Sequence, residues 1–323
     1  MSTNTAGKQR RTLKDYIGLV ARGFAMGSAD VVPGVSGGTM AFILGIYEEL
    51  VQSIKEVAAP DFLKAVFSLK IREALQIINW QFLVAVASGI LLAIITLAPS
   101  LEWLLENQKV YLMAFFFGLV LASTIVVAQR IERWGVDRIG LMALGAVGAF
   151  LIVGLVPAQT PDTWWFLLLA GSVAICAMIL PGISGAFILL LLGKYQTVLA
   201  AVGDRDIITL GLVAIGAGFG IVTFAQLLGW LFKRYRDLTI AFLTGLMIGS
   251  LRKIWPWKEV LETTIVDGEE LILREMNILP ALGPEVFIAL GLGAAAFVLV
   301  IVLEQLASRG QTNSEQAEPG AAK

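Results

Sequence analysis

Long runs of apolar residues, with almost no charges inside them, dominate the chain. Five of these runs lie at 80–101, 110–127, 139–159, 163–193 and 207–231. Each is near or above the roughly 20 apolar residues that cross a hydrocarbon core of about 30 Å. The pattern predicts a polytopic membrane protein whose spans are α-helices.

Three blocks of sequence occur twice, in the same order both times. The first block holds Pro-Gly-x-Ser-Gly followed by Leu-Gly-x-Tyr, and the other two lie in later apolar runs. A repeated order of matched blocks predicts an internal duplication of the chain. The matched blocks are 33–47 with 181–195, 114–123 with 241–250, and 143–150 with 289–297.

Each copy predicts a helix pair broken at Pro-Gly, followed by three membrane-spanning helices. The broken pair either crosses twice or, as we favour, is re-entrant, and both give an even number of crossings. Three further spans make the total odd, so the second copy is inverted relative to the first. The predicted fold class is an all-α polytopic membrane protein with two inverted-topology repeats. Repeat 1 covers 13–157, with its break at 33–38 and spans at 80–99, 110–128 and 139–157; repeat 2 covers 158–306, with its break at 181–186 and spans at 207–231, 238–251 and 284–304; tails cover 1–12 and 307–323.

Composition and charge agree with a membrane protein. Only 15% of the residues are charged, against about 25% in soluble domains. Threading the spans puts the basic clusters on one side, which is cytoplasmic by the positive-inside rule. Both termini are then cytoplasmic, and the polar C-terminal tail is predicted to be disordered. The basic clusters lie at 8–22, 55–72, 130–138 and 233–236.

Missing residue types exclude several kinds of chemistry. The chain has no histidine and a single cysteine, Cys176. Histidine catalysis, histidine-ligated metals, cysteine metal sites and disulfides are therefore excluded. A net charge of −1 argues against a nucleic-acid partner. We expect no cofactor and no metal.

The two Pro-Gly breaks are candidate anion sites. Proline and glycine interrupt the helix ladder, so a new helix begins inside the apolar run. A helix start carries unpaired N–H groups and a partial positive charge, which suit a phosphate. The alternative is that these small residues only allow close helix packing in lipid. The candidates are Gly34, Ser36, Gly37, Gly38 and Thr39 in the first copy, and Gly182, Ser184 and Gly185 in the second.

Charged residues near the breaks are further candidates, because a charge at the bilayer centre costs about 2.5–3.5 kcal/mol. Arg22 and Asp30 precede the first break and either serve the site or form a structural pair. Glu48 is a candidate proton carrier or an interfacial carboxylate. Lys194 and Arg252 are candidates for contact with an anion from the outer side.

The two loops resemble the signature loops of the polyprenyl-phosphate translocase family, long catalogued as a domain of unknown function. The resemblance rests on residues 29–39 and 180–185 and extends in motif order from about 15 to 303. It implies a flippase in the bacterial plasma membrane that moves undecaprenyl phosphate between leaflets for reuse, without enzyme activity. The resemblance and the helix starts together imply that the loops hold the phosphate, with Arg22 and Arg252 neutralising it on either approach. Coupling to protons or sodium is expected, and one repeat would rock against the other.

Two other functions remain open. A small soluble anion, exported with protons or sodium, would use the same helix starts. A membrane polyprenyl-pyrophosphate phosphatase would need an arginine where this chain has Gly37 or Gly185, and a carboxylate pair that is missing. Without these groups, hydrolysis lacks charge stabilisation and proton transfer. A lipid substrate predicts a lateral opening between helices, whereas a soluble anion predicts a closed aqueous vestibule.

Overall fold

The computed structural model describes residues 11–32, 35–57, 59–158, 160–161, 163–266 and 269–316. The chain divides into two compact units: unit 1 comprises 1–102 and 157–239, and unit 2 comprises 103–156 and 240–323. These units do not coincide with the predicted repeats. Each unit takes a part of repeat 1 and a part of repeat 2, so the chain crosses between units within each repeat.

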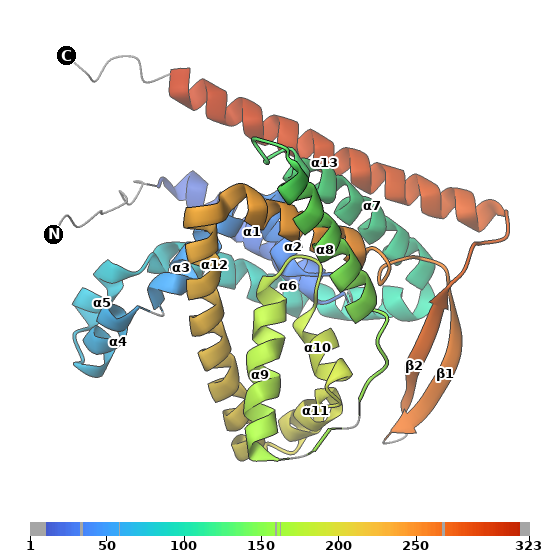
Figure 1. Ribbon diagram of the computed structural model, residues 1–323, viewed down its shortest axis with the longest axis horizontal. Coiled ribbons are helices and arrows are strands. Elements are labelled where there is room, and N and C mark those ends of the chain that lie inside the picture. The colour runs from blue at the N-terminus through green and yellow to red at the C-terminus, as the bar shows by residue number, and fades with distance from the viewer. Residues whose placement is uncertain are drawn as a thin grey trace. The chain divides into compact units, whose positions relative to one another are not determined.

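Unit 1 contains the helices on both sides of the two Pro-Gly motifs (Figure 1). Glycines bring these helices into backbone contact: a Cβ on Gly23 of the first helix would overlap the Val86 carbonyl, and one on Gly171 would overlap that of Val213. The helices are α1 (Leu13–Asp30), α2 (Gly37–Ile43), α3 (Tyr47–Val57), α4 (Pro60–Phe67), α5 (Ile71–Ile77), most of α6 (Trp80–Asn107), α9 (Trp164–Ile179), α10 (Gly185–Leu191), α11 (Tyr195–Gly203) and the first part of α12 (Ile207–Ser250).

The turn after each short helix is the same in both copies. Gly45 ends the α2 region with φ of 71°, and Gly193 ends the α10 region with φ of 63°. These left-handed values favour glycine, which has no Cβ to strain. At the second turn, α10 and α11 meet at 108°. The matched Leu-Gly-x-Tyr blocks therefore encode a matched reversal of the chain.

Unit 2 contains α7 (Lys109–Ala128), α8 (Val136–Ile152), the last part of α12, and α13 (Pro284–Gln316). Its helix contacts are exchanged between the predicted repeats. Gly118 of α7, in repeat 1, packs against the backbone of Gly293 in α13, in repeat 2. Conversely, Gly245 of α12, in repeat 2, packs against Met142 of α8, in repeat 1. Such reciprocal packing is expected of duplicated halves, although the inversion itself stays a prediction.

The all-α prediction is wrong in one place. The segment after α12 forms an antiparallel hairpin of β1 (Lys258–Val266) and β2 (Glu269–Asn277), with Lys258 opposite Asn277. A β-bulge lies near Glu262, where the register shifts. The first strand is rich in β-branched residues, which favour extended backbone, and the second strand supplies hydrogen-bond partners for its backbone groups.

Several predicted boundaries differ from the structure. Non-helical angles at Tyr235 break α12 between the predicted spans 207–231 and 238–251. The helix predicted at 139–157 is α8, which starts earlier and ends at Ile152, since Gly154 and Pro157 disfavour further turns. α13 continues to Gln316 through residues that we expected to be disordered. Each residue added to the end of an existing helix gains a backbone hydrogen bond without the free-energy cost of nucleating a new helix. Residues 1–10 and 317–323 of the predicted tails lie outside the described residues.

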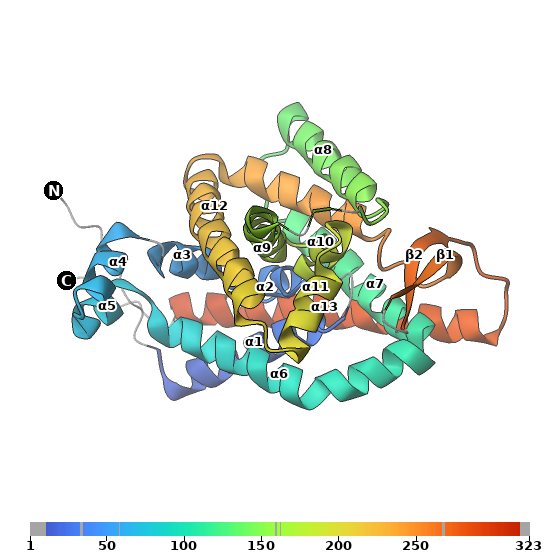
Figure 2. The same ribbon diagram turned by 90° about the horizontal axis from the view of Figure 1, so that it is seen from below.

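The chain is a multi-pass membrane protein. Among the described residues, four helices are long and apolar enough to cross a bilayer, and α10 with α11 adds a fifth if the bent pair is one span. The four are in α6, α7, α12 and α13, whereas α9 is a shorter apolar helix. Figure 2 gives a second view of the same helices.

Gly118→Ala tests whether glycine contacts hold unit 2 together. A Cβ at this position overlaps the Gly293 backbone, which has no flexible end to move away. We expect a net loss of about 1–3 kcal/mol, the usual cost of overpacking, seen as a lower thermal midpoint in detergent.

Gly140→Ala on α8 is the matched control, because no atom lies within 4 Å of its added Cβ. This change should leave the midpoint unchanged or raise it, since alanine is the better helix former. Equal midpoints for the two variants would contradict the packing argument.

Candidate functional site

The two Pro-Gly loops contact each other inside unit 1. The Ser36 hydroxyl donates to the Leu180 carbonyl at 3.2 Å, and the Gly182 N–H donates to Thr39 Oγ1 at 3.0 Å. Tyr47, just after the first loop, donates its hydroxyl to the Ile179 carbonyl at 3.1 Å. Residues 132 to 144 positions apart in the chain thus share one hydrogen-bonded junction. Pro33 and Gly34 lie outside the described residues.

A carboxylate of the protein occupies the start of α2. The Gly37 N–H donates to Asp30 Oδ1 at 2.6 Å, while the Gly38 N–H donates to the Ser36 hydroxyl at 3.1 Å. A Cβ on Gly37 would overlap the Asp30 carboxylate, so glycine is required for this contact. Ser36 and Thr39 are buried, with 2% and 0% of their surface exposed. The start of α2, where we predicted a bound phosphate, is therefore occupied by the Asp30 carboxylate of the protein itself.

The start of α10 is different. Ser184 precedes this helix, but its side chain makes no capping hydrogen bond. When the two Pro-Gly motifs are aligned, Met178 stands where the first copy has Asp30. Gly182 has a φ of 90°, which only glycine adopts without strain. The second loop thus lacks the internal carboxylate of the first, while Gly185 packs against the Ala174 carbonyl of α9.

Arg22 and Asp30 are not a structural pair. Both lie on α1, and their separation of eight residues corresponds to about 12 Å along a helix. Asp30 bonds Gly37 instead. Within the described part of the chain, Arg22 has no ion-pair or hydrogen-bond partner, and its side chain is half-buried.

Glu48 and Lys194 lie in contrasting surroundings. Glu48 Oε1 accepts from Arg236 at 2.8 Å, and both side chains are more than 40% exposed, where such pairs contribute little. Lys194 is 1% exposed. Its Nζ donates to the Thr160 carbonyl at 3.1 Å and lies 5.6 Å from the centre of the Phe166 ring. The lysine thus has partners in the core of unit 1, away from open solvent.

Arg252 lies in unit 2 and caps the end of α8. Its Nη1 donates to the Phe150 carbonyl at 2.9 Å, and its guanidinium lies 4.3 Å from the centre of the Phe150 ring. A Cβ on Gly154 would overlap this guanidinium. A cation at a helix C-terminus is favourable, so part of the role of Arg252 is structural. The contacts join it to α8 rather than to either Pro-Gly loop.

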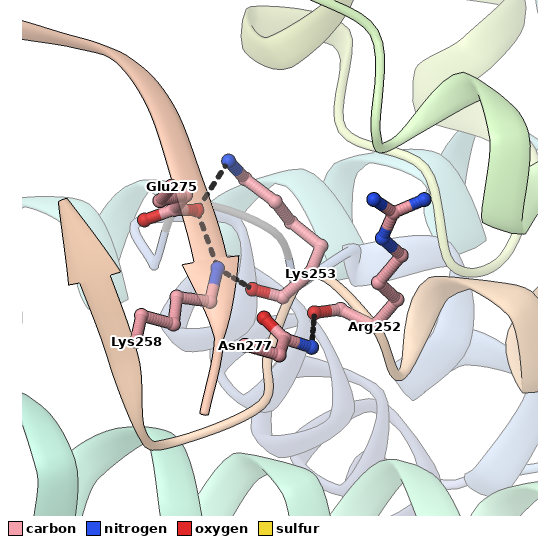
Figure 3. Close-up of polar contacts among 5 residues, drawn as sticks. All are labelled: Arg252, Lys253, Lys258, Glu275 and Asn277. Carbon is pink, nitrogen blue, oxygen red and sulfur yellow. Dashed lines mark hydrogen bonds and ion pairs between the residues drawn. The ribbon is translucent and has the colours of Figure 1, made fainter. Parts of the chain in front are cut away.

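Two lysines share one carboxylate where the hairpin joins α12, an arrangement that the sequence did not predict (Figure 3). Lys253 Nζ lies 2.9 Å from Glu275 Oε1, and Lys258 Nζ contacts the same oxygen. Lys258 also donates to the Lys253 carbonyl at 2.7 Å. Burial of Lys258 lowers its pKa to about 8, with Glu275 opposing the shift. Burial tends to raise the pKa of Glu275, but the two ammonium groups prevail and lower it to about 2.

Comparison with known proteins identifies the family. Residues 26–271 match the sequence profile of a family described as undecaprenyl phosphate translocase-like. The chain belongs to this family. The predicted resemblance is therefore confirmed, and both Pro-Gly loops lie within the matched region of this translocase-like chain.

Two curated relatives of the translocase-like chain are named as transporters. A polyprenyl-phosphate transporter of Vibrio cholerae is 42% identical over 312 residues, covering 94% of this chain and 100% of the relative. A polyprenyl-phosphate transporter of Staphylococcus aureus is 28% identical over 255 residues, covering 73% and 85%. No solved structure matches.

Glu275→Gln tests the shared carboxylate. The substitution leaves Lys253 and Lys258 adjacent without their counter-ion, and we expect a loss of about 1–3 kcal/mol in thermal unfolding at pH 7. The folded-state pKa of Glu275 is lowered from 4.5 to about 2. The stabilisation is therefore complete above pH 4.5 and is lost as the pH falls toward 2.

The exposed Glu259 provides the control. Glu259→Gln should keep the wild-type thermal midpoint and its dependence on pH. In Glu275→Gln, the midpoint should fall less than in wild type as the pH is lowered from 4.5 to 2. If both variants follow the wild-type curve, Glu275 does not hold the lysines.

Proposed function

We propose that this chain is a transporter that moves undecaprenyl phosphate between the leaflets of the bacterial plasma membrane, returning the lipid carrier for reuse. The names of the relatives and the family support a polyprenyl phosphate as the substrate. The observation that carries the proposal is the carboxylate of Asp30 at the start of α2, bonded to the Gly37 N–H. It marks a buried place with donors for an anionic oxygen.

The phosphate competes with Asp30 for this place. A phosphate oxygen that accepts the Gly37 N–H displaces the carboxylate and reaches the Ser36 and Thr39 hydroxyls. Those hydroxyls now join the two loops, so binding of the phosphate exchanges loop-to-loop bonds for bonds to the substrate. The remaining ligands come from Gly38 and, in the second loop, from Gly182, Ser184 and Gly185. The exchange keeps an acceptor on the Gly37 and Gly182 N–H groups, which offsets part of the cost of displacing Asp30.

A charged side chain guides the head group. Arg22, half-buried on α1, neutralises the phosphate as it approaches the loops. One repeat then rocks against the other around the bound phosphate, with both termini in the cytoplasm. Protons or sodium drive the cycle. Glu48 is the first candidate for coupling, and Asp30 is a second, because it is the carboxylate that the substrate displaces.

The two rival functions fit less well. Both curated relatives are named as transporters, which favours transport over hydrolysis of a pyrophosphate. The same names favour a lipid over a small soluble anion.

Transport is tested with purified protein in liposomes that contain undecaprenyl phosphate. The exposure of the head group on each leaflet is followed with time under an imposed proton or sodium gradient. Wild-type protein should speed equilibration at least ten-fold over empty liposomes. Arg22→Ala and the Ser36→Ala/Ser184→Ala double variant should abolish most of that gain.

Release of inorganic phosphate from the pyrophosphate form would instead establish an enzyme. If neither lipid is moved nor hydrolysed, the lipid proposal fails and the export of a soluble anion becomes the leading account. The Gly140→Ala variant, whose added Cβ meets no atom within 4 Å, serves as the transport-competent control.

Asp30→Asn tests the competition directly. The amide oxygen still accepts from the Gly37 N–H, but the negative charge that opposes the phosphate is removed. We expect roughly ten-fold tighter binding of a short-chain polyprenyl phosphate in calorimetry, equivalent to about 1.4 kcal/mol, together with slower transport. Asp61→Asn, an exposed change on α4, should leave both unchanged. Unaltered binding in Asp30→Asn would remove Asp30 from the proposal.

A further inference from the structure

Unit 2 contains an apolar groove that is separate from the Pro-Gly loops. Its volume is about 330 Å³, and α7, α13 and the segment 255–257 form its walls. The lining is almost wholly apolar and includes Gly118 and Gly293, at the helix contact, together with Trp255 and Trp257. Nothing in this groove would solvate a soluble anion, because polar ligands need polar partners when they leave water.

Glycines and large aromatic residues together determine the shape of the groove. The close contact of α7 and α13 at Gly118 and Gly293 leaves space beside the two backbones. The Phe117 and Trp255 rings meet edge to face, with centroids 5.4 Å apart, and Trp255 and Trp257 meet at 5.6 Å. Trp255 Nε1 donates to the Ile278 carbonyl at 2.9 Å. This bond fixes the aromatic wall, so the groove is formed before any ligand arrives.

The groove is open along its side. Leu121 on α7, and Leu290 and Val298 on α13, line it and are 36%, 57% and 57% exposed. Both helices are candidate membrane spans, so the exposed rim faces hydrocarbon. A lateral opening of this kind admits a lipid chain from the bilayer, whereas a soluble solute would require an aqueous route.

Basic groups lie at one end of the groove. Lys258 directly follows Trp257 in the sequence, and Lys253 contacts the same carboxylate, Glu275. Lys109 is near enough to act electrostatically on Lys258 and precedes Ala114 of the lining by about 7.5 Å along α7. Two ammonium groups, those of Lys253 and Lys258, therefore contact one carboxylate, and Lys109 acts on Lys258 from farther away. This end has an excess of positive charge, and it is the part of the groove that suits an anionic head group.

We infer that this groove holds the isoprenoid chain of a polyprenyl phosphate, with the phosphate at the end where Lys253 and Lys258 share Glu275. The inference rests on the proposed function and adds to it a second place for the substrate, at which the lipid docks from the bilayer. The chain lies against the aromatic wall, and its remaining length stays in the membrane. The phosphate gains the excess positive charge without displacing Glu275.

The groove is tested by photolabelling the full-length protein in lipid nanodiscs. The probe is a short-chain isoprenoid phosphate with a diazirine in its chain, and the labelled peptides are mapped by mass spectrometry. Label should fall on α7, α13 and residues 255–257. Excess undecaprenyl phosphate should remove it, while the same excess of phosphatidylglycerol should not.

Ala294→Leu fills the groove from α13, where Ala294 belongs to the lining. Ala295→Leu is the matched control, because it makes the same change at the next exposed position outside the lining. We expect at least five-fold less labelling and slower transport in Ala294→Leu, with wild-type values in Ala295→Leu. Lys109→Gln should weaken labelling several-fold without moving it along the chain.

The outcomes separate the two proposals. Equal competition by phosphatidylglycerol would make the groove an ordinary lipid contact and overturn the inference. Normal labelling and transport in Ala294→Leu would also overturn it, while leaving the proposed function intact. If wild-type protein fails to transport undecaprenyl phosphate, the proposed function fails whatever the labelling pattern.

Discussion

Close contact between helix backbones is the constraint on which this structure depends. Lipid is as apolar as leucine, so burial of apolar side chains does not drive membrane helices together. Van der Waals contact has to do so, and glycine allows the closest approach. Gly23 and Gly171 supply such contacts in unit 1, and Gly118 and Gly245 supply them in unit 2. These glycines position the loops in one unit and the apolar groove in the other.

The need to hydrogen-bond every backbone group within the protein explains the contacts of the Pro-Gly loops. A helix that begins inside an apolar region exposes N–H groups that water cannot reach. Asp30 and Ser36 satisfy the start of α2, and Thr39 accepts from the second loop. A ligand at this place has to replace the bonds it breaks. The proposed phosphate meets this requirement, because its several oxygens can accept from the donors at the helix start.

The sequence was most informative where one physical signal dominated. Long apolar runs predicted the candidate spans in α6, α7, α12 and α13. The matched Leu-Gly-x-Tyr blocks correspond to matched turns at Gly45 and Gly193. The hairpin was missed, although Asp267-Gly268 after a run of β-branched residues is a known hairpin signal. The second strand has only one β-branched residue, Ile272, so it carries little signal of its own.

The candidate site was less predictable than the fold. That Asp30 would bond Gly37 could not be foreseen, since a helix-start carboxylate and a mutual pair with Arg22 have the same sequence appearance. The charge cluster at Glu275 depends on a strand register that brings Lys258 near residues 275–277. The extension of α13 to Gln316 likewise reflects cooperative growth of a helix rather than the preference of its residues.

The exchange of partners between the repeats has a consequence for the origin of the chain. One repeat alone would leave the glycine faces of α7 and α8 without the helices that now cover them. Such a half-length protein could bury both faces only on a second copy of itself. The contacts of Gly118 with Gly293 and of Gly245 with Met142 have the reciprocal pattern that two copies of one repeat would make. The two copies differ in sequence, since only the first carries an aspartate, Asp30, ahead of its helix start.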